Sequence, residues 1–368
     1  MRVGLVIYGS LELVSGGYLY DRKLVNYLQR QGDEVHIIAL PWRNYLRHLG
    51  DNFASPLLQR LEKGAFDILV QDELNHPSLF YLNRRLRRKI KYPLIAIIHH
   101  LRSSELRPAW QNRFYGWIEK QYLVTLDGFV FNSHTTQQTV HQMGEGLPLK
   151  PSIVAQPGGD QFQTSISEAE IIHRCALPGP LRLLFLGNLI PRKGLHTLLE
   201  AMQQLSPETC TLTVIGNLET DRSYTGFLRG LIRQGGLEGR VQLCGYLEAA
   251  DVAQALKNHH VLVAPSSYEG FGIVYLEGMA FGLPAIGSTA GAAGEIITPE
   301  VDGFLIPPGD ALTLAECIRR LAQDREALLA LSLAARRRYL AQPTWEQTTE
   351  RIRAFLSNWQ GLTPRGVT

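Results

Sequence analysis

The sequence has few cysteines and no long apolar run. Its 368 residues include only four cysteines, which lie far apart and form no CxxC pair. No run approaches the roughly 18 apolar residues that a membrane-spanning helix needs. The N-terminus, MRVGLVIYG, lacks a signal-peptide core and a cleavage site and is typical of a buried first strand. We therefore expect a cytoplasmic protein with reduced, buried thiols at Cys175, Cys210, Cys244 and Cys317.

Two kinds of functional signature are also missing. The sequence has no G-x-S-x-G nucleophile elbow, and no nucleic-acid-binding motif accompanies its basic residues. The net charge is only +3, but residues 1–160 carry 19 basic and 14 acidic residues, whereas residues 161–368 carry 18 and 20. We therefore expect the first half to face an anionic partner or surface, and we expect no nucleic acid as partner.

Short apolar runs alternate with helical stretches along the first half of the chain. Strand-like runs lie at residues 2–9, 33–40, 66–73, 92–100 and 126–133, each followed by a polar loop. Between the first two runs, YLYDRKLVNYLQRQG has helical spacing and stops at Gly32. Strands that alternate with helices predict a parallel sheet covered on both faces.

The same pattern restarts after residues 151–163, which are rich in proline and glycine and are predicted as a linker. Strand-like runs follow at residues 181–188, 210–217, 240–247, 260–267 and 283–289. We therefore predict an α/β protein with two doubly wound, Rossmann-like domains at residues 1–165 and 175–342. Ligands of such sheets bind beyond the carboxyl ends of the strands, so two facing domains would form a central cleft.

The stretch YEGFGIVYLE, residues 268–277, brackets a glycine-rich turn with two glutamates. A paired acid and base, a metal site and a nucleotide-sugar cradle would all use such residues. The stretch follows a predicted strand, and residues 273–282 are predicted as a helix whose first-turn N–H groups would favour a phosphate. Glu269 would precede this helix and Glu277 would lie within it, so they would hold two parts of one long ligand. The alternative is a turn glutamate and a solvated helix glutamate.

Several segments together resemble retaining glycosyltransferase family four. EGFGIVYLE matches the family's E-x7-E signature, and VSGGYLYD, IIHH, FNS, GNLIPRKG, GYL and TAGAAGEIITPEVDGFLIPPGD also occur in family order. The resemblance covers nearly the whole chain. It implies the GT-B fold, with two Rossmann-like domains around a donor cleft and a C-terminal helix, residues 344–360, that crosses back to the first domain.

The resemblance places the donor site in the second half of the chain. It implies that Glu277 holds the ribose hydroxyls, that Glu269 contacts the donor sugar and that Lys193 neutralises the departing diphosphate. The chain departs from the family at Asn188, where an arginine is usual, and Arg192 is a candidate to supply the missing charge. The other expected donor contacts are Gly245, Tyr246, Leu247, Gly270, Phe271, Gly272 and Ile273.

In the first half, the resemblance points to a Gly-Gly loop and a histidine. Gly16 and Gly17 would approach the donor phosphate and the acceptor from a loop before the first helix. His99 ends the fourth strand, aligns with the family's cleft histidine, and joins Glu269 and Lys193 as an expected catalytic residue. His99 and His100 alone are too few ligands for a metal ion.

Other polar residues at strand ends are candidates for an acceptor pocket. Arg102, Glu105 and the loop at 71–76 are placed there by the predicted strand ends. The sequence has no D-x-D aspartate pair of the kind that binds a divalent metal in the other large glycosyltransferase fold. The resemblance likewise implies transfer without a metal or other cofactor.

Residues 84–91, RRLRRKIK, hold six basic residues in eight positions. Leu79, Leu82, Leu86 and Ile90 share one face at helical spacing, which predicts an amphipathic helix. Its apolar face would either pack against the core or attach reversibly to an anionic membrane.

The sequence therefore predicts an enzyme that transfers a hexose, with retention, from a nucleotide-diphosphate sugar to an acceptor. A membrane lipid, a lipid-linked glycan and a polysaccharide are the acceptors we expect, at the inner face of the cytoplasmic membrane. A non-catalytic nucleotide-sugar binder and a sugar-nucleotide epimerase are the alternatives. A phosphorylase of this fold is disfavoured because such enzymes need a pyridoxal lysine and a much longer chain.

Overall fold

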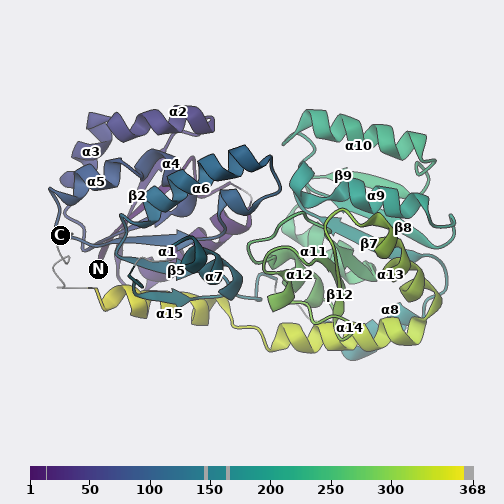
Figure 1. The fold of residues 1–368 in the computed structure, drawn as a ribbon. Helices are drawn as coiled ribbons and strands as arrows, with labels where there is room; N and C mark the ends of the chain where they lie inside the picture. The colour runs from purple at the N-terminus through teal and green to yellow at the C-terminus, as the bar shows by residue number, and fades with distance from the viewer. Residues whose placement is uncertain (14, 145–147, 163–165, 360–368) are drawn as a thin grey trace. The chain divides into compact units, whose positions relative to one another are not determined.

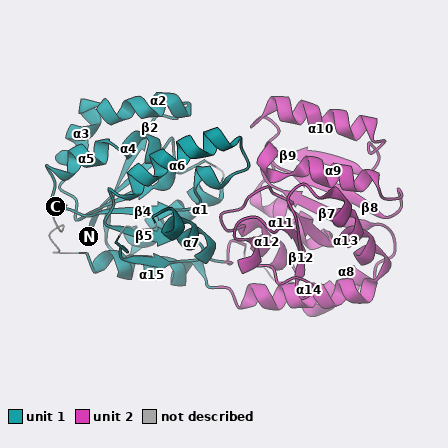
Figure 2. Ribbon diagram, viewed as in Figure 1, with its two compact units in different colours: residues 1–158, 343–368 teal, residues 159–342 magenta. Residues whose placement is uncertain are grey.

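The computed structural model describes residues 1–13, 15–144, 148–162 and 166–359 (Figure 1). Contacts divide the chain into two compact units, residues 1–158 with 343–368 and residues 159–342 (Figure 2). The first segment of the first unit therefore ends at Gly158, whereas the linker composition suggested a boundary at 165. The last helix, α15 (Trp345–Ser357), belongs to the first unit; residue 360 of the expected range lies outside the described residues.

The first unit is built on a six-stranded sheet in the order β2-β1-β3-β4-β5-β6. Every pairing in it is parallel. Its strands are β1 (Arg2–Tyr8), β2 (Glu34–Leu40), β3 (Ile68–Asp72), β4 (Leu94–Ile98), β5 (Gly128–Phe131) and β6 (Ser152–Val154). Strand β6 corrects the prediction that residues 151–163 form only a linker. It is a three-residue edge strand, and Pro151 directly before it fits such a position.

The helices of the first unit follow its strands. They are α1 (Gly16–Arg30), α2 (Tyr45–Leu49), α3 (Ser55–Glu62), α4 (His76–Leu79), α5 (Leu82–Arg87), α6 (Ala109–Leu123), α7 (His134–Met143) and α15. Short 3-10 helices occur at Gly50–Phe53, Glu73–Asn75 and Arg102–Ser104. Helix α15 is tied to the start of the unit, because Arg353 donates a 2.7 Å hydrogen bond to Asp33.

Helix α1 begins earlier than the sequence suggested. The hydroxyl of Ser15 accepts a 3.3 Å hydrogen bond from the N–H of Tyr18, which satisfies one donor of the first turn. Gly16 and Gly17 are therefore the first residues of the helix, and the prediction that they form a preceding loop is wrong.

The basic segment 84–91 is not one continuous helix. Leu79 ends α4, and α5 stops at Arg87. Leu79, Leu82 and Leu86 are fully buried in the core of the unit, so the apolar side of this segment faces the protein interior.

The second unit has a six-stranded parallel sheet in the order β12-β11-β10-β7-β8-β9. Its strands are β7 (Leu181–Leu186), β8 (Cys210–Ile215), β9 (Val241–Gly245), β10 (Val261–Val263), β11 (Ala285–Ser288) and β12 (Gly303–Ile306). Its helices are α8 (Glu168–Ala176), α9 (Leu195–Gln203), α10 (Arg222–Gln234), α11 (Ala249–Asn258), α12 (Ile273–Met279), α13 (Ala311–Gln323) and α14 (Arg325–Leu340), with 3-10 turns at Pro191–Lys193 and Ala293–Glu295.

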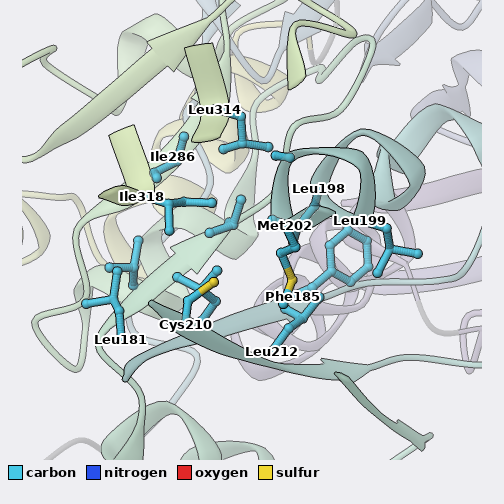
Figure 3. Close-up of a cluster of buried hydrophobic side chains, with 14 of the residues drawn as sticks. Leu181, Phe185, Leu198, Leu199, Met202, Cys210, Leu212, Ile286, Leu314 and Ile318 are labelled. Atoms are coloured by element: carbon cyan, nitrogen blue, oxygen red, sulfur yellow. The ribbon is translucent and has the colours of Figure 1, made fainter. Parts of the chain in front are cut away.

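Apolar side chains cover both faces of this second sheet. Alternate residues of β7 point to opposite faces: Leu183 and Phe185 enter one buried cluster and Leu184 enters the other. Figure 3 shows the first cluster, where Leu198 and Met202 of α9 pack near Phe185. The alternation explains why these strands read as continuous apolar runs, as expected for a sheet buried on both sides.

The four thiols are free, as expected, but only two are buried. Cys175 and Cys210 lie in the core of the second unit, whereas Cys244 and Cys317 are half-buried. No helix among the described residues is both long and apolar enough to span a lipid bilayer.

Candidate active site

Both sheets have a topological switch point, and the candidate residues gather there. In the second unit the chain runs outward from β7 to β8 and β9 and then returns to β10 on the other side of β7. In sheets of this kind the loops on the two sides of the switch point diverge, and ligands bind between them beyond the carboxyl ends of the strands. Lys193 lies in the loop that follows β7 and Glu269 in the loop that follows β10.

An ion pair joins the two loops. Lys193 Nζ lies 2.6 Å from Glu269 Oε1, and the hydroxyl of Ser266 donates a 2.7 Å hydrogen bond to the same oxygen. Arg192 Nη1 lies 3.8 Å from Glu269 Oε2 and donates a 2.7 Å hydrogen bond to the backbone oxygen of Tyr268. Two cations therefore converge on one carboxylate that is only 6% exposed.

The charges of this group outweigh its burial. Burial alone favours the neutral acid at Glu269, but Lys193 and Arg192 oppose it and lower the pKa of the carboxyl to about 2. Glu269 is therefore an ionised hydrogen-bond acceptor at neutral pH, whereas general-acid chemistry would require a proton on it.

Backbone packing fixes this loop geometry at Gly194. The residue has a φ of +71°, and a Cβ there would lie 2.1 Å from the backbone oxygen of Pro265. Only glycine combines that conformation with so close an approach. The KG pair thus holds the Lys193 loop directly against the chain that leads to Glu269.

Glu277 lies in the body of α12, as predicted, and is half-buried. Among the residues that the structure describes, no hydrogen-bond or ion-pair partner reaches its carboxylate. Burial raises the pKa of Glu277 to about 7, although Lys193 opposes the shift. The site therefore contains one carboxylate that is already satisfied and another that is available to a ligand.

The remaining predicted donor contacts lie around the same sheet edge. Gly272 precedes the first residue of α12, Ile273, and no side chain caps the helix, while Phe271 is buried. Gly270 and Asn188 sit in the loops after β10 and β7. Tyr246, 57% exposed, follows the last residue of β9, Gly245, and Leu247 is half-buried beyond it.

The first unit has a comparable group at its own switch point, between β1 and β3. His99 follows β4, and its Nε2 lies 3.6 Å from Oδ1 of Asp21 on α1. The carboxylate of Glu73 accepts a 2.8 Å hydrogen bond from the backbone N–H of His99. A Cβ at Gly17 would lie 3.3 Å from the ring, so glycine there lets the histidine pack against the first turn of α1.

Several polar atoms of this group are buried without a hydrogen-bond partner within the described structure. They include both carboxylate oxygens of Asp21, Oδ2 of Asp72 and Nε2 of His99. Buried polar atoms without partners are rare and mark places where a ligand or ion completes the set. Asp21, Asp72 and His99 offer ligand atoms within 4.8 Å of one another, a donor set that a metal ion accepts.

The charges in this group raise the pKa values of both His99 and Asp72. Burial disfavours the charged ring of His99, but Asp21, Asp72 and Glu73 outweigh it and raise its pKa to about 9. Burial, with the charge of Asp21, raises the pKa of Asp72 to about 7. An imidazolium next to three carboxyl groups is therefore the ionisation that the unit favours at neutral pH.

Of the predicted acceptor-pocket residues, Asp72 and Glu73 of the loop at 71–76 belong to the His99 group, whereas Glu105 lies in a separate network. His100 Nε2 lies 3.1 Å from Glu105 Oε1, and Arg107 pairs with the other oxygen of Glu105. The guanidinium of Arg102 lies over the ring of Tyr115, 4.8 Å from its centroid.

Sequence reasoning missed two residues of the site, Asp21 and Ser266. Asp21 was detectable, because it is an acidic residue on the buried stripe of α1 that includes Tyr18 and Leu24. An unpaired carboxylate seldom occupies such a position. Ser266 gave no comparable signal, because serine is common at strand ends.

Comparison with known proteins finds a family match for part of the chain and relatives of known name. Residues 176–338 match the family of glycosyl transferases group 1. The amylovoran biosynthesis glycosyltransferase AmsK of Erwinia amylovora is 32% identical over 201 residues, which are 52% of this chain and 47% of that protein. The phosphatidyl-myo-inositol mannosyltransferase of Mycobacterium leprae is 24% identical over 92% of this chain and 93% of its own.

A solved structure supports the fold over nearly the full length. HepE of Anabaena, in complex with UDP and glucose, has a TM-score of 0.75 at 20% identity, and the match covers 97% of this chain and 99% of HepE. Both units thus have counterparts in one protein of known structure. The chain therefore has the GT-B fold, and most of its second unit matches the family of glycosyl transferases group 1.

Proposed function

We propose that this protein is a retaining glycosyltransferase that transfers a hexose from a nucleotide-diphosphate sugar. The observation that carries the proposal is the cationic pair around Glu269, with the available carboxylate of Glu277 in the following helix. A nucleotide sugar carries a diphosphate between two groups of hydroxyls, and this site offers cations and carboxylates in a matching set.

The residues of the second unit fit three parts of the donor. Lys193 and Arg192 would neutralise the charge that develops on the diphosphate as the sugar leaves, which is where fixed cations accelerate a reaction most. Glu269, ionised and held in place, would accept hydrogen bonds from sugar hydroxyls, and Glu277 from the ribose hydroxyls. The backbone of residues 270–273 would line the sugar and diphosphate, and residues 245–247 would border the base.

We infer retention from the resemblance to retaining glycosyltransferase family four; the contacts of Glu269 argue only that this carboxylate is not the nucleophile of a double displacement. Among the described residues around Glu269, the carboxylate is already engaged by Lys193 and Ser266. Attack and departure on one face of the sugar, assisted by the leaving diphosphate, needs no enzyme nucleophile. His99 and the Gly16–Gly17 turn would contribute to the donor and acceptor from the first unit.

We propose that transfer needs no metal ion or other cofactor, because Lys193 and Arg192 supply the positive charge at the diphosphate. Turnover should then be unchanged by EDTA. Loss of turnover in EDTA, with recovery on adding a divalent ion, would overturn this part and direct attention to Asp21, Asp72 and His99.

We propose a membrane lipid, a lipid-linked glycan or a polysaccharide as acceptor, with the enzyme attached peripherally to an anionic membrane surface. One full-length relative is named for transfer to phosphatidyl-myo-inositol. In segment 84–91, Arg84, Arg88 and Lys91 are exposed. Arg87 pairs with Asp127, and Lys89 lies 2.8 Å from Glu62.

Donor turnover over a panel of UDP- and GDP-hexoses tests the function most economically. Without an acceptor, we expect slow hydrolysis of one donor. NMR should show that the sugar is first released with the anomeric configuration that it had in the donor. Binding of a donor without hydrolysis or transfer to any acceptor would indicate a non-catalytic binder. Inversion at a ring carbon of the free nucleotide sugar would indicate an epimerase.

A further inference from the structure

Helix α6 leaves an aromatic stripe exposed. Trp110, Phe114 and Trp117 follow the i, i+4, i+7 spacing that places side chains on one face of a helix. Their exposed fractions are 71%, 37% and 55%, although such a stripe usually packs into a core. A different side of the helix supplies the core contacts, through Ile118 and Tyr122.

Helix α2 extends this exposed face. Trp42, just before α2, is 61% exposed, and Leu46 within it is 70% exposed. The ring of Tyr45 lies 6.1 Å from that of Phe114 and 4.7 Å from that of Tyr115, so α2 and α6 are neighbours, as Figure 1 shows. We call the exposed side chains of residues 42–47 and 110–117 the aromatic face.

Two arginines without an acidic partner among the described residues lie in the segments that carry the aromatic face. Residues 41–50 and 106–118 contain four arginines, of which Arg43 pairs with Asp51 and Arg107 pairs with Glu105. Arg47 and Arg113 are exposed, and neither makes an ion pair within the described structure. Lys120 is exposed one turn beyond Trp117. The face therefore combines large amphipathic rings with unpaired positive charge.

We propose that the aromatic face is a docking surface for an anionic lipid bilayer, into which Trp42, Leu46, Trp110, Phe114 and Trp117 insert at headgroup depth. Exposed apolar patches of this kind mark interaction sites, and tryptophan favours the membrane–water interface. Arginines on the same face complement anionic headgroups. A two-fold contact between copies of the chain would instead bring like charges together.

The surface is distinct from segment 84–91, whose leucines are buried. The ring of Trp117 lies 6.2 Å from that of Phe80, just before α5. The basic residues after α5 would therefore attract the protein to an anionic bilayer over a longer distance, and the side chains of the aromatic face would insert into it. The inference rests on the proposed function in one respect, because a lipid acceptor would explain why the enzyme binds a membrane. Binding to the membrane does not itself require catalysis.

Co-sedimentation of the full chain with vesicles tests the proposal. We expect binding to phosphatidylcholine vesicles that contain phosphatidylglycerol, weak binding to pure phosphatidylcholine, and weaker binding at high salt. Trp110→Ser with Trp117→Ser should lower the partition coefficient at least about tenfold, and Arg47→Ala with Arg113→Ala should lower it on anionic vesicles. Phe227→Ser, at a residue 51% exposed on α10, is the matched control and should bind like wild type.

Quenching of tryptophan fluorescence by brominated lipids gives a second readout, which does not depend on the amount of protein bound. Three of the five tryptophans, Trp42, Trp110 and Trp117, lie on the aromatic face. Vesicles with bromine in the upper acyl chain should quench wild-type emission strongly and the double tryptophan variant much less. Equal binding by wild type and both double variants, or no quenching on bound protein, would overturn the proposal.

Two further results separate the other outcomes. A lipid-free dimer that the Trp110→Ser/Trp117→Ser variant abolishes, with no vesicle binding, would assign the face to a second copy of the chain. Donor hydrolysis in solution should be unchanged in the folded variants. Vesicle binding without any donor turnover would leave this inference standing and overturn the proposed function instead.

Discussion

Lys193 Nζ and Glu269 Oε1 lie 2.6 Å apart in the second unit, although 75 residues separate them in the chain. They come from the loops after β7 and β10, which are neighbours in the sheet, so the sheet topology creates the pair. The hydroxyl of Ser266 donates a hydrogen bond to the same oxygen of Glu269.

Removing the lysine should destabilise the second unit. Lys193→Met leaves an ionised carboxylate buried, with Arg192 at 3.8 Å as the remaining cation described near it. We expect a loss of about 3 kcal/mol in the free energy of unfolding. Urea unfolding at pH 7 measures it. Lys193→Met with Glu269→Gln should recover part of the loss, because no charge is then stranded. A cost below about 0.5 kcal/mol would show that the pair is no stronger than a surface ion pair.

Donor binding should weaken as the pH falls through about 7. Burial holds the pKa of Glu277 near 7 in the free protein, so below that pH the carboxyl carries a proton that ribose binding must displace. Affinity should fall toward a limit of about tenfold per pH unit. Calorimetric titration with a nucleotide sugar between pH 5.5 and 8.5 measures it. Glu277→Gln should bind more weakly with a flat profile, and an unchanged slope in that variant would remove Glu277 from the ribose site.

The ionisation of His99 should depend on Asp21. The folded pKa of about 9 exceeds the ordinary value of 6.5, so the charged ring contributes stability below pH 6.5, and this contribution is lost as the pH rises through 9. Asp21→Asn should lower the His99 pKa by at least about one unit, as followed by NMR of the imidazole. Asp67→Asn, which changes a carboxylate outside this group, is the control; an equal shift in both variants would contradict the assignment.

Gly17→Ala should lower activity, although alanine is normally more stabilising than glycine within a helix. The new Cβ would lie 3.3 Å from the His99 ring, so the ring must move, and we expect lower kcat with a stability change within about 1 kcal/mol. Gly226→Ala is the control, because that glycine lies in α10 with open space around it. It should gain stability and keep full activity. Full activity in Gly17→Ala would show that the position of His99 is not critical.

The sequence was sufficient for the alternating strands, because a strand buried on both faces reads as an unbroken apolar run. It was also sufficient to place Glu269 before α12 and Glu277 within that helix. Strand β6 could not be predicted from the sequence, because a strand of three residues is too short to show an apolar pattern within a segment rich in proline and glycine. Sequence reasoning placed Gly16 and Gly17 in a loop because the Ser15 cap is visible only once the helix start is known.

The exposed aromatic face shows a different limit. Trp110, Phe114 and Trp117 have the spacing of a core-facing stripe, and periodicity alone does not say which side of a helix the protein covers. The leucines of segment 84–91 have similar spacing and are buried. Only exposed fractions separate the two cases.

Single-turnover transfer by Glu269→Gln tests the central claim most directly. The change keeps the shape of the side chain but removes the charge that Lys193 holds in place. We predict a fall of about 10²–10³ in the rate of the chemical step, with donor affinity changed much less and with Glu248→Gln, at an exposed carboxylate, as active as wild type. Transfer at the wild-type rate by a folded Glu269→Gln protein would contradict the assignment of this site.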